Sequence, residues 1–225
     1  MNLTLFDLDG TLIATDSDHA FGQYLVDRGW ADRDEFTRRN DAFYADYLAG
    51  RLDQAAYIDF ATAPWRDRPA AAADALRADF VRERILPAVH DSARALVRRH
   101  QDAGDKVAIV TATNEFITRP IADLFGVPQL LALDLERDPA GRATGRIRGI
   151  PSFREGKIAR VLQWLAGADM TASSFDRITV YSDSENDLPL LEWATHPVAT
   201  NPGAGLLAVA RSRGWPILRL FETPQ

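Results

Sequence analysis

The sequence predicts an α/β fold, namely a Rossmann-like open parallel sheet with an inserted α-helical cap domain and a small β-hairpin. Short runs of branched apolar residues recur along the chain, and each ends at a polar residue. Amphipathic helical patterns separate these runs, and strands that alternate with helices pair in parallel through right-handed crossovers. Between residues 15 and 87 the alternation stops and every pattern is helical.

Three segments have the length and composition of buried strands: residues 3–8, 106–111 and 177–182. Between them, the apolar periodicity predicts helices over residues 92–103, 115–125 and 155–165. Gly104 and Gly126 follow two of these helices, at the position where a C-terminal cap is expected. These elements assign residues 1–14 and 88–225 to an α/β core domain.

The segment from residue 15 to 87 is predicted to be a helical cap domain inserted after the first strand. Helical patterns cover residues 19–27, 32–49, 54–61 and 70–84, and four consecutive alanines support the last of them by propensity. Pro64, Pro69 and Pro87 are interpreted as breaks between helices. Further along, residues 130–135 and 143–150 flank the turn-like Asp138-Pro139-Ala140-Gly141, which predicts a β-hairpin beside the sheet.

Composition excludes several classes of function. The chain has 225 residues, a net charge of −6 and no cysteine. The absence of a basic stripe argues against a nucleic-acid partner, and the absence of cysteine excludes disulfides, thiolate catalysis and cysteine-ligated zinc. No signal peptide or membrane-spanning stretch is evident, so we expect a cytoplasmic protein with no membrane partner, either a monomer or a homodimer.

Candidate catalytic residues lie at the predicted strand ends, where ligands bind in open α/β sheets. Asp7 and Asp9 end the first strand, Thr111 ends the second, and an acidic cluster beginning at Asp183 ends the third, while Lys157 opens a later helix. Two or three neighbouring carboxylates repel one another, and Mg²⁺ with oxygen ligands offsets that repulsion.

This set of residues suits phosphoryl transfer. A carboxylate can attack phosphorus to form an aspartyl-phosphate, and Asp9 could protonate the leaving alcohol and later deprotonate water. Thr111 with the adjacent Ala112 backbone N–H, Lys157 and Asn186 suit phosphoryl oxygens. Each residue alone also has an ordinary structural explanation, such as a turn, a solvated lysine or a helix cap. Their joint occurrence in this order favours the chemical interpretation.

The same residues resemble the four motifs of the haloacid dehalogenase-like phosphohydrolases, which occur here in order as Asp7-Leu8-Asp9-Gly10-Thr11-Leu12, Val107-Ala108-Ile109-Val110-Thr111, Lys157 and Asp183-Ser184-Glu185-Asn186-Asp187. The helical insertion resembles the phosphoserine-phosphatase-like subgroup. The resemblance implies that Asp7 is the nucleophile and Asp9 the general acid/base. It also implies a flap over residues 10–16.

The resemblance further implies a ligand set. Mg²⁺ would be bound by Asp7, the backbone carbonyl of Asp9 and Asp183, with Asp187 supporting the metal site. Phosphate would be held by Thr111, Ala112 and Lys157, and Asn186 would contact it or the attacking group.

One departure from the subgroup concerns the substrate, which we expect to be a small phosphorylated metabolite. Phosphoserine phosphatases grip the amino-acid head with a cap acid and a cap arginine. Asp16 can fill the acid role, but no arginine lies around residues 55–63, and Arg51 and Arg66 only flank the gap. Phosphoserine is therefore disfavoured, and an amino-acid-related phosphate such as histidinol phosphate becomes a candidate.

Alternatives stay open at this point. A phosphoserine phosphatase, a phosphomutase or another phosphotransferase would share every core motif. A receiver-like phosphoacceptor module is disfavoured by the chain length and by Asp7 and Asp9 on the first strand. A dehalogenase would lack the second acid of the first motif, which is present here as Asp9.

Overall fold

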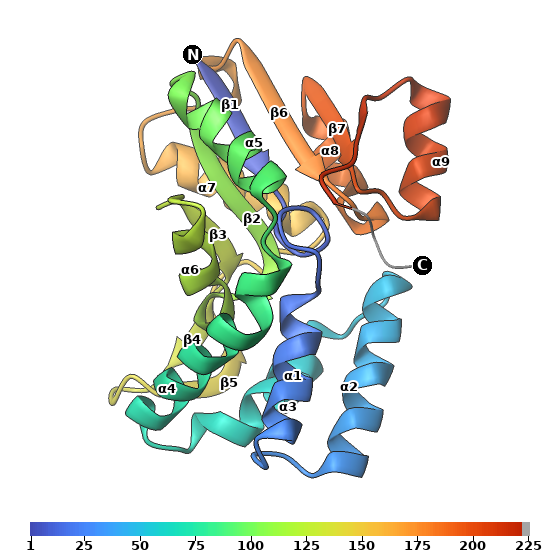
Figure 1. Cartoon of the computed structure of the whole chain (residues 1–225). Helices are drawn as coiled ribbons and strands as arrows, with labels where there is room; N and C mark the ends of the chain where they lie inside the picture. Colours follow the sequence, from blue (N-terminus) through green and yellow to red (C-terminus); the bar gives the residue numbers. More distant parts are fainter. Residues whose placement is uncertain (222–225) are drawn as a thin grey trace.

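The computed structural model describes residues 1–221 and is built around a six-stranded parallel sheet (Figure 1). The strand order is β3-β2-β1-β6-β7-β8. The strands are β1 (Asn2–Phe6), β2 (Lys106–Asn114), β3 (Leu130–Leu133), β6 (Arg177–Ser182), β7 (His196–Thr200) and β8 (Ile217–Leu218). Strand β1 lies between β2 and β6, so its carboxyl end is flanked by the ends of both neighbours.

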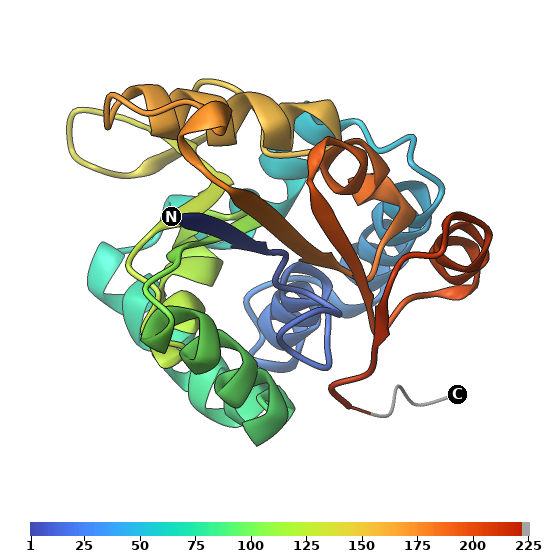
Figure 2. The same cartoon turned by 90° about the horizontal axis from the view of Figure 1, so that it is seen from above.

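Helices cover both faces of the sheet, as Figure 2 shows. The alternation of side chains along β1 explains this arrangement: Phe6 packs in a core with α5 (Asp91–Asp102) and α6 (Glu115–Leu124), whereas Leu3 and Leu5 pack on the opposite face. That second face is covered by α7 (Glu155–Ala166), α8 (Leu188–Trp193) and α9 (Ala204–Arg213). A strand buried on both faces is mostly apolar, and in residues 3–6 the one polar side chain, Thr4, donates its buried hydroxyl to Oδ2 of Asp105 at 2.9 Å.

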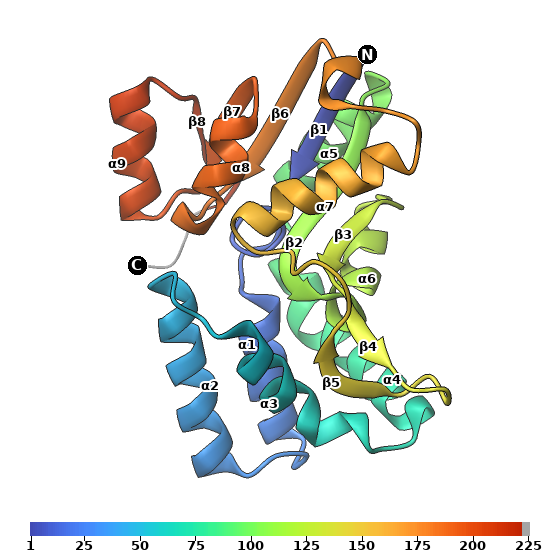
Figure 3. The ribbon, with the colours of Figure 1, turned by 180° about the vertical axis from the view of Figure 1, so that it is seen from behind.

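The four helices between β1 and β2 are α1 (Ser17–Asp27), α2 (Arg33–Leu48), α3 (Gln54–Arg66) and α4 (Ala70–Phe80). The first three begin at aspartates that accept a backbone N–H, namely Asp16, Asp32 and Asp53. Helices α1, α2 and α3 lie beyond the carboxyl end of β1, on the side to which its arrow points (Figure 3). The helical insertion that the sequence predicts is therefore confirmed.

Two details of the predicted helices are wrong. Pro64 does not end a helix, because α3 continues through it to Arg66. The buried Trp65 donates its indole N–H to the Ala61 carbonyl at 3.1 Å, and its packing retains this last turn despite the proline. The helix predicted to end at residue 84 changes at Phe80 into a π-helical turn over Val81–Ile85.

The predicted hairpin also needs correction. Its first arm is divided: Leu130–Leu133 is β3, a parallel edge strand of the main sheet, and only β4 (Leu135–Arg137) pairs with β5 (Ala143–Ile147) as a hairpin. Strand β2 extends past Thr111 to Asn114, with a register shift after Val110. Strands β7 and β8 were missed because they are short and begin beside prolines. Within residues 1–221, no helix is long and apolar enough to cross a bilayer.

Candidate active site

The turn after β1 positions Asp7 and Asp9. The Leu8 carbonyl accepts the backbone N–H groups of Leu12 at 2.8 Å and Ile13 at 3.1 Å, which closes a compact turn. Gly10 has φ +71°, and a Cβ at this position would lie 2.3 Å from Oδ2 of Asp183. Glycine is therefore required here both by the backbone conformation and by the close approach of the third acidic motif.

Lys157 joins two carboxylates in the interior of the protein. Its ammonium Nζ lies 2.8 Å from Oδ1 of Asp7 and 2.7 Å from Oδ2 of Asp187, and its side chain is 2 % exposed. Ser182 donates to the same Asp187 oxygen at 2.8 Å. Burial alone would lower the pKa of Lys157, but the charges of Asp187 and Asp7 raise it above its ordinary value. Lys157 therefore remains protonated and fixes the orientation of Asp7.

Thr11 links the first and third acidic motifs. Its hydroxyl lies 3.2 Å from Oδ2 of Asp7 and 3.1 Å from Oδ1 of Asp183. Burial, followed by the charges of Asp7 and Asp187, raises the pKa of Asp183 well above its ordinary range. Burial likewise raises the pKa of Asp7 to about 6, although Lys157 opposes this.

These charges are unbalanced in a way that a divalent cation would correct. Asp7, Asp183 and Asp187 carry three negative charges when ionised, and Lys157 supplies one positive charge among them. A hard cation with oxygen ligands would neutralise the remaining two, so the donor set fits Mg²⁺. In residues 1–221, no group of three or more acidic or histidine side chains is arranged to hold a metal. Asp7 and Asp183 share the Thr11 hydroxyl, so we expect these two carboxylates to be the side-chain ligands of Mg²⁺. Asp187 is already engaged by Lys157 and Ser182.

Asp9 is held differently from Asp7. Its Oδ1 accepts the Ser17 backbone N–H at 2.8 Å, and its Oδ2 accepts the Thr113 hydroxyl at 2.9 Å. Burial, followed by the charge of Asp16, raises the pKa of Asp9 to about 7 despite these bonds. A carboxyl group with this pKa exchanges its proton near neutral pH, as a general acid/base must.

The residues after β2's register shift line the same cavity. Thr111 is buried, and its hydroxyl accepts the Thr113 backbone N–H at 3.2 Å. Ala112 lies between them on the cavity wall. The structure thus brings Thr111 and Ala112 next to Asp7 and Asp9 along one surface.

Asn186, which the resemblance assigns to the phosphate or the attacking group, bonds to the helical insert in this structure, and its role toward phosphate stays a prediction. Its side-chain N–H donates to the Tyr47 carbonyl at 2.8 Å, near the end of α2. Arg154 donates to the Gly50 carbonyl at 3.1 Å in the same turn. The physical reason for the Asn186 bond is that the last carbonyls of a helix lack intrahelical donors, and Asn186 supplies one.

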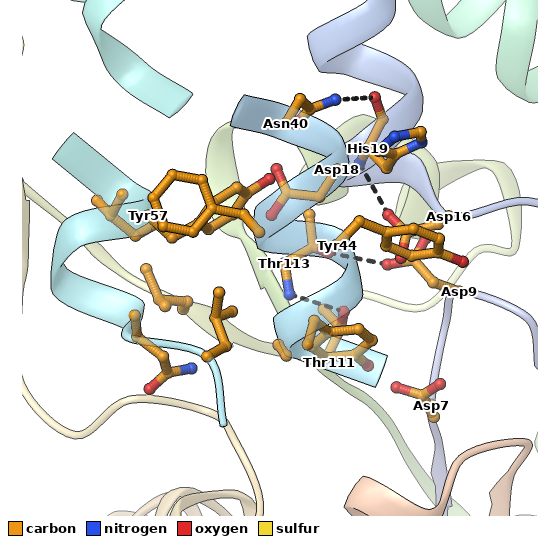
Figure 4. A pocket seen from close by; sticks show the side chains of 17 residues that line it. Asp7, Asp9, Asp16, Asp18, His19, Asn40, Tyr44, Tyr57, Thr111 and Thr113 are labelled. Carbon is orange, nitrogen blue, oxygen red and sulfur yellow. Dashed lines mark hydrogen bonds between the residues drawn. The ribbon is translucent and has the colours of Figure 1, made fainter. Parts of the chain in front are cut away.

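A cavity above Asp7 lies between the strand ends and the helical insert (Figure 4). Its walls carry the carboxylates of Asp9, Asp16 and Asp18 and the rings of Tyr44 and Tyr57. Among the described residues that line it, none is arginine or lysine. Arg51 and Arg66, which flank the gap noted in the sequence, instead pair with Asp46 and Asp59.

Comparison with known proteins identifies the family. The family model of the haloacid dehalogenase-like hydrolases matches residues 4–192. This chain belongs to that family. A histidinol-phosphatase of Neisseria meningitidis is 44% identical over 217 residues. The match covers 96% of this chain and 98% of the relative. A phosphoserine phosphatase of Mycobacterium tuberculosis is 34% identical over 94% of this chain and 68% of the relative.

Solved structures agree with this haloacid dehalogenase-like fold. A protein of unknown function from Bordetella pertussis Tohama I has a TM-score of 0.92 and 45% identity, covering 98% of this chain and 99% of that one. A substrate-bound phosphoserine phosphatase has a TM-score of 0.67 at 14% identity, covering 96% of this chain and 91% of that one, which is a likeness of fold.

Several residues of the site were not predicted from the sequence. Thr11 and Thr113 hold the carboxylates of Asp7 and Asp9, and Asp18 and Tyr57 line the far part of the cavity. The position of Thr113 could have been predicted, because it stands two residues after Thr111 and side chains of that spacing share a face of a strand. No sequence pattern predicts Tyr57, because a helical tyrosine in an apolar pattern is usually a core residue.

Proposed function

We propose that this protein is a Mg²⁺-dependent phosphatase that hydrolyses histidinol phosphate through an aspartyl-phosphate. The observation that supports this substrate most directly is the charge of the cavity. Asp16 and Asp18 face it, and no arginine or lysine among the described residues lines it. A substrate with a protonated amine and no carboxylate suits such walls, and histidinol phosphate is an amino alcohol phosphate. The 44% identity to a histidinol-phosphatase supports the same substrate.

In the proposed first step, an Oδ atom of Asp7 attacks phosphorus while the bond from phosphorus to the alcohol oxygen breaks. Asp9 gives its proton to that oxygen, so the alcohol leaves neutral. In the second step Asp9 takes a proton from water, the resulting hydroxide attacks phosphorus, and the carboxylate of Asp7 is regenerated with release of phosphate. Asp9 is suited to both steps because its pKa is about 7.

The phosphoryl oxygens would be held by donors next to Asp7. An ammonium group has three N–H donors, and Lys157 uses two of them on Asp7 and Asp187. We propose that the third binds a phosphoryl oxygen, together with the hydroxyl of Thr111 and the backbone N–H of Ala112, two residues of the cavity wall. Mg²⁺ held by Asp7, Asp183 and the Asp9 carbonyl would supply charge neutralisation.

Residues 15–87 are proposed to act as a cap domain over the core formed by residues 1–14 and 88–225. In support, the cavity has walls from both, with Asp7 and Thr111 on one side and Tyr44 and Tyr57 on the other. Asn186 and Arg154 fasten the end of α2 to the core. A cap over the site would limit it to a small metabolite and would shield the aspartyl-phosphate from water until the alcohol has left.

A panel of phosphomonoesters tests the proposal. We expect release of inorganic phosphate from histidinol phosphate with Mg²⁺ and none after removal of metal by EDTA, with phosphoserine and glycerol phosphate at least tenfold poorer in kcat/KM. Equal rates of histidinol and phosphate formation would support hydrolysis, whereas histidinol in excess over phosphate would indicate transfer to another acceptor. Preference for phosphoserine would overturn the substrate assignment.

A further inference from the structure

Asp18 is an acid that the phosphoryl-transfer chemistry does not use. It lies in the first turn of α1, two residues after the helix cap, where Asp16 already accepts the His19 backbone N–H at 2.8 Å. Capping therefore does not explain Asp18. Its side chain faces the cavity rather than bulk solvent, beside Tyr57 and at the opposite end from Asp7 (Figure 4).

The surroundings of Asp18 lack a cation. Within residues 1–221, Asp18 forms no ion pair with lysine, arginine or histidine, because the nearby His19 pairs with Asp41 at 2.8 Å instead. Behind Asp18 lies a smaller hollow whose walls are mostly apolar, with Phe21 and Trp65 among them, and whose polar lining residues carry no positive charge. Burial, followed by the charges of Asp16 and Asp9, raises its pKa well above the ordinary range, and the neighbouring Tyr57 hydroxyl opposes this shift. An isolated acid in such a place is costly unless a ligand neutralises it.

The position of Asp18 is fixed by close packing of two helices. Asn40 of α2 donates its side-chain N–H to the His19 carbonyl of α1 at 3.1 Å. Gly22 of α1 makes this approach possible, because a Cβ there would lie 2.7 Å from the Asn40 amide nitrogen. The part of α1 that carries Asp18 is therefore held in place at the cavity wall, as the support of a recognition group must be.

The order of acids along the cavity matches the order of groups in the proposed substrate. In histidinol phosphate the amine is two carbons from the phosphate ester oxygen, and the imidazole lies beyond it. With the phosphate at Asp7, the amine would lie between the two ends of the cavity that Asp16 also lines, and the imidazole would lie toward the end at which Asp18 and Tyr57 lie. The aromatic rings of Tyr44 and Tyr57 also suit a flat cationic ring.

We infer that Asp18, supported by Tyr57, binds the nitrogen-bearing group of the substrate farthest from the phosphate, and so selects an amino alcohol phosphate that ends in an imidazole. This inference rests on the proposed function, because the order of groups is taken from histidinol phosphate. Asp18 is a specificity residue in this scheme: it contacts neither phosphorus nor the leaving oxygen.

Three substrates separate the possible roles: histidinol phosphate, its analogue without the amine (3-imidazolylpropyl phosphate), and an analogue without the imidazole (2-aminopropyl phosphate). Asp18→Asn is expected to raise KM for both imidazole substrates by about 10- to 100-fold, the range for a lost hydrogen bond to a charged group. It should leave kcat/KM for 2-aminopropyl phosphate within about twofold of wild type. Tyr57→Phe should show the same pattern with a loss of about 2- to 10-fold.

The control is Asp34→Asn, an exposed acid in the first turn of α2 outside the cavity, which should change none of the three substrates. A melting temperature measured without substrate distinguishes binding from folding. Because Asp18 lacks a cationic partner in the empty protein, Asp18→Asn should melt no lower than wild type, whereas loss of a merely structural residue would lower it.

Different results would refute the proposed function and the proposed role of Asp18. If wild type does not hydrolyse histidinol phosphate, the proposed function is wrong. If wild type prefers histidinol phosphate but Asp18→Asn weakens all three substrates equally, or none, the role of Asp18 is overturned while the proposed function stands. Loss confined to the two amine-bearing substrates would also overturn it, because Asp18 would then bind the amine.

Discussion

Replacing Lys157 by methionine tests the ion network that orients Asp7. The chain has two lysines, Lys106 and Lys157, and the second is buried against two carboxylates. Methionine retains most of the side-chain volume but removes the charge and all three donors. Asp7 and Asp187 would then be buried without a counter-charge in the metal-free protein.

The expected magnitude follows from the burial. Exposed fractions of 2%, 8% and 3% for the Lys157, Asp7 and Asp187 side chains place both pairs in the interior. Removing one partner from a buried ion pair costs about 3–5 kcal/mol in the free energy of unfolding. For a chain of this size, each kcal/mol lowers the melting temperature by about 2–4 °C, so we expect a decrease of about 6–20 °C.

Thermal and urea unfolding, measured at pH 7.5 in EDTA, give the result directly. Lys106→Met is the matched control, because Lys106 loses a contact with the Trp164 ring worth about 0.5–1 kcal/mol. A double-mutant cycle with Asp187→Asn should yield a coupling energy above about 1 kcal/mol. If Lys157→Met lowers the free energy of unfolding no more than Lys106→Met does, Lys157 does not stabilise Asp7 and Asp187, and the proposed charge balance of the site is wrong.

The remaining predictions concern the other carboxylates. Asp7→Asn should reduce phosphate release at least about 1000-fold, because an amide is a poor nucleophile, while the circular dichroism spectrum stays native. Thr113→Val removes the hydroxyl that stabilises ionised Asp9, so the pKa of Asp9 should rise further and the alkaline limb of the kcat profile should move to higher pH by about one unit or less. In the metal-free protein, the pKa values of Asp7 and Asp9 are raised from 3.8 to about 6 and about 7, so the folded state binds more protons than the unfolded state between about pH 4 and 7. Stability should therefore increase as pH falls from 8 to 5, and saturating Mg²⁺ should weaken or reverse this trend; a melting temperature that falls steadily over that range in EDTA would contradict it.

The sheet and the strand-end acids could be predicted from the sequence because their signals are local. A buried strand such as β1 is a short apolar run, and Asp7 interrupts it at the carboxyl end. The hairpin was misjudged because residues 130–135 form one continuous apolar run, yet the chain changes partners within it from β2 to β5. Which neighbour a strand chooses depends on tertiary packing that periodicity does not encode.

The cavity walls were harder to predict because they depend on contacts between distant segments. Asn186 stands in a motif associated with phosphate, but its partner is Tyr47, which is 139 residues away. Asp18 differs little in sequence from the exposed first-turn acid Asp34, yet Asp18 is half-buried at the cavity wall, where α1 packs against α2 through Gly22 and Asn40. Helix propensity is the same for both, so the sequence alone could not separate a recognition acid from a solvated one.

The charge distribution connects the two proposals. Asp7, Asp9, Asp16, Asp18 and Asp183 are all acids whose pKa values are raised first by burial. Lys157 offsets the charge at one end of this row, near Asp7, and among the described lining residues no lysine or arginine lies at the other end. The empty cavity is therefore less stable than an apolar one would be, and a ligand that restores balance must be positive at both places. Mg²⁺ near Asp7 and a substrate with an amine and an imidazole beyond it would meet that requirement, whereas a substrate with a carboxylate in the same position would add to the repulsion.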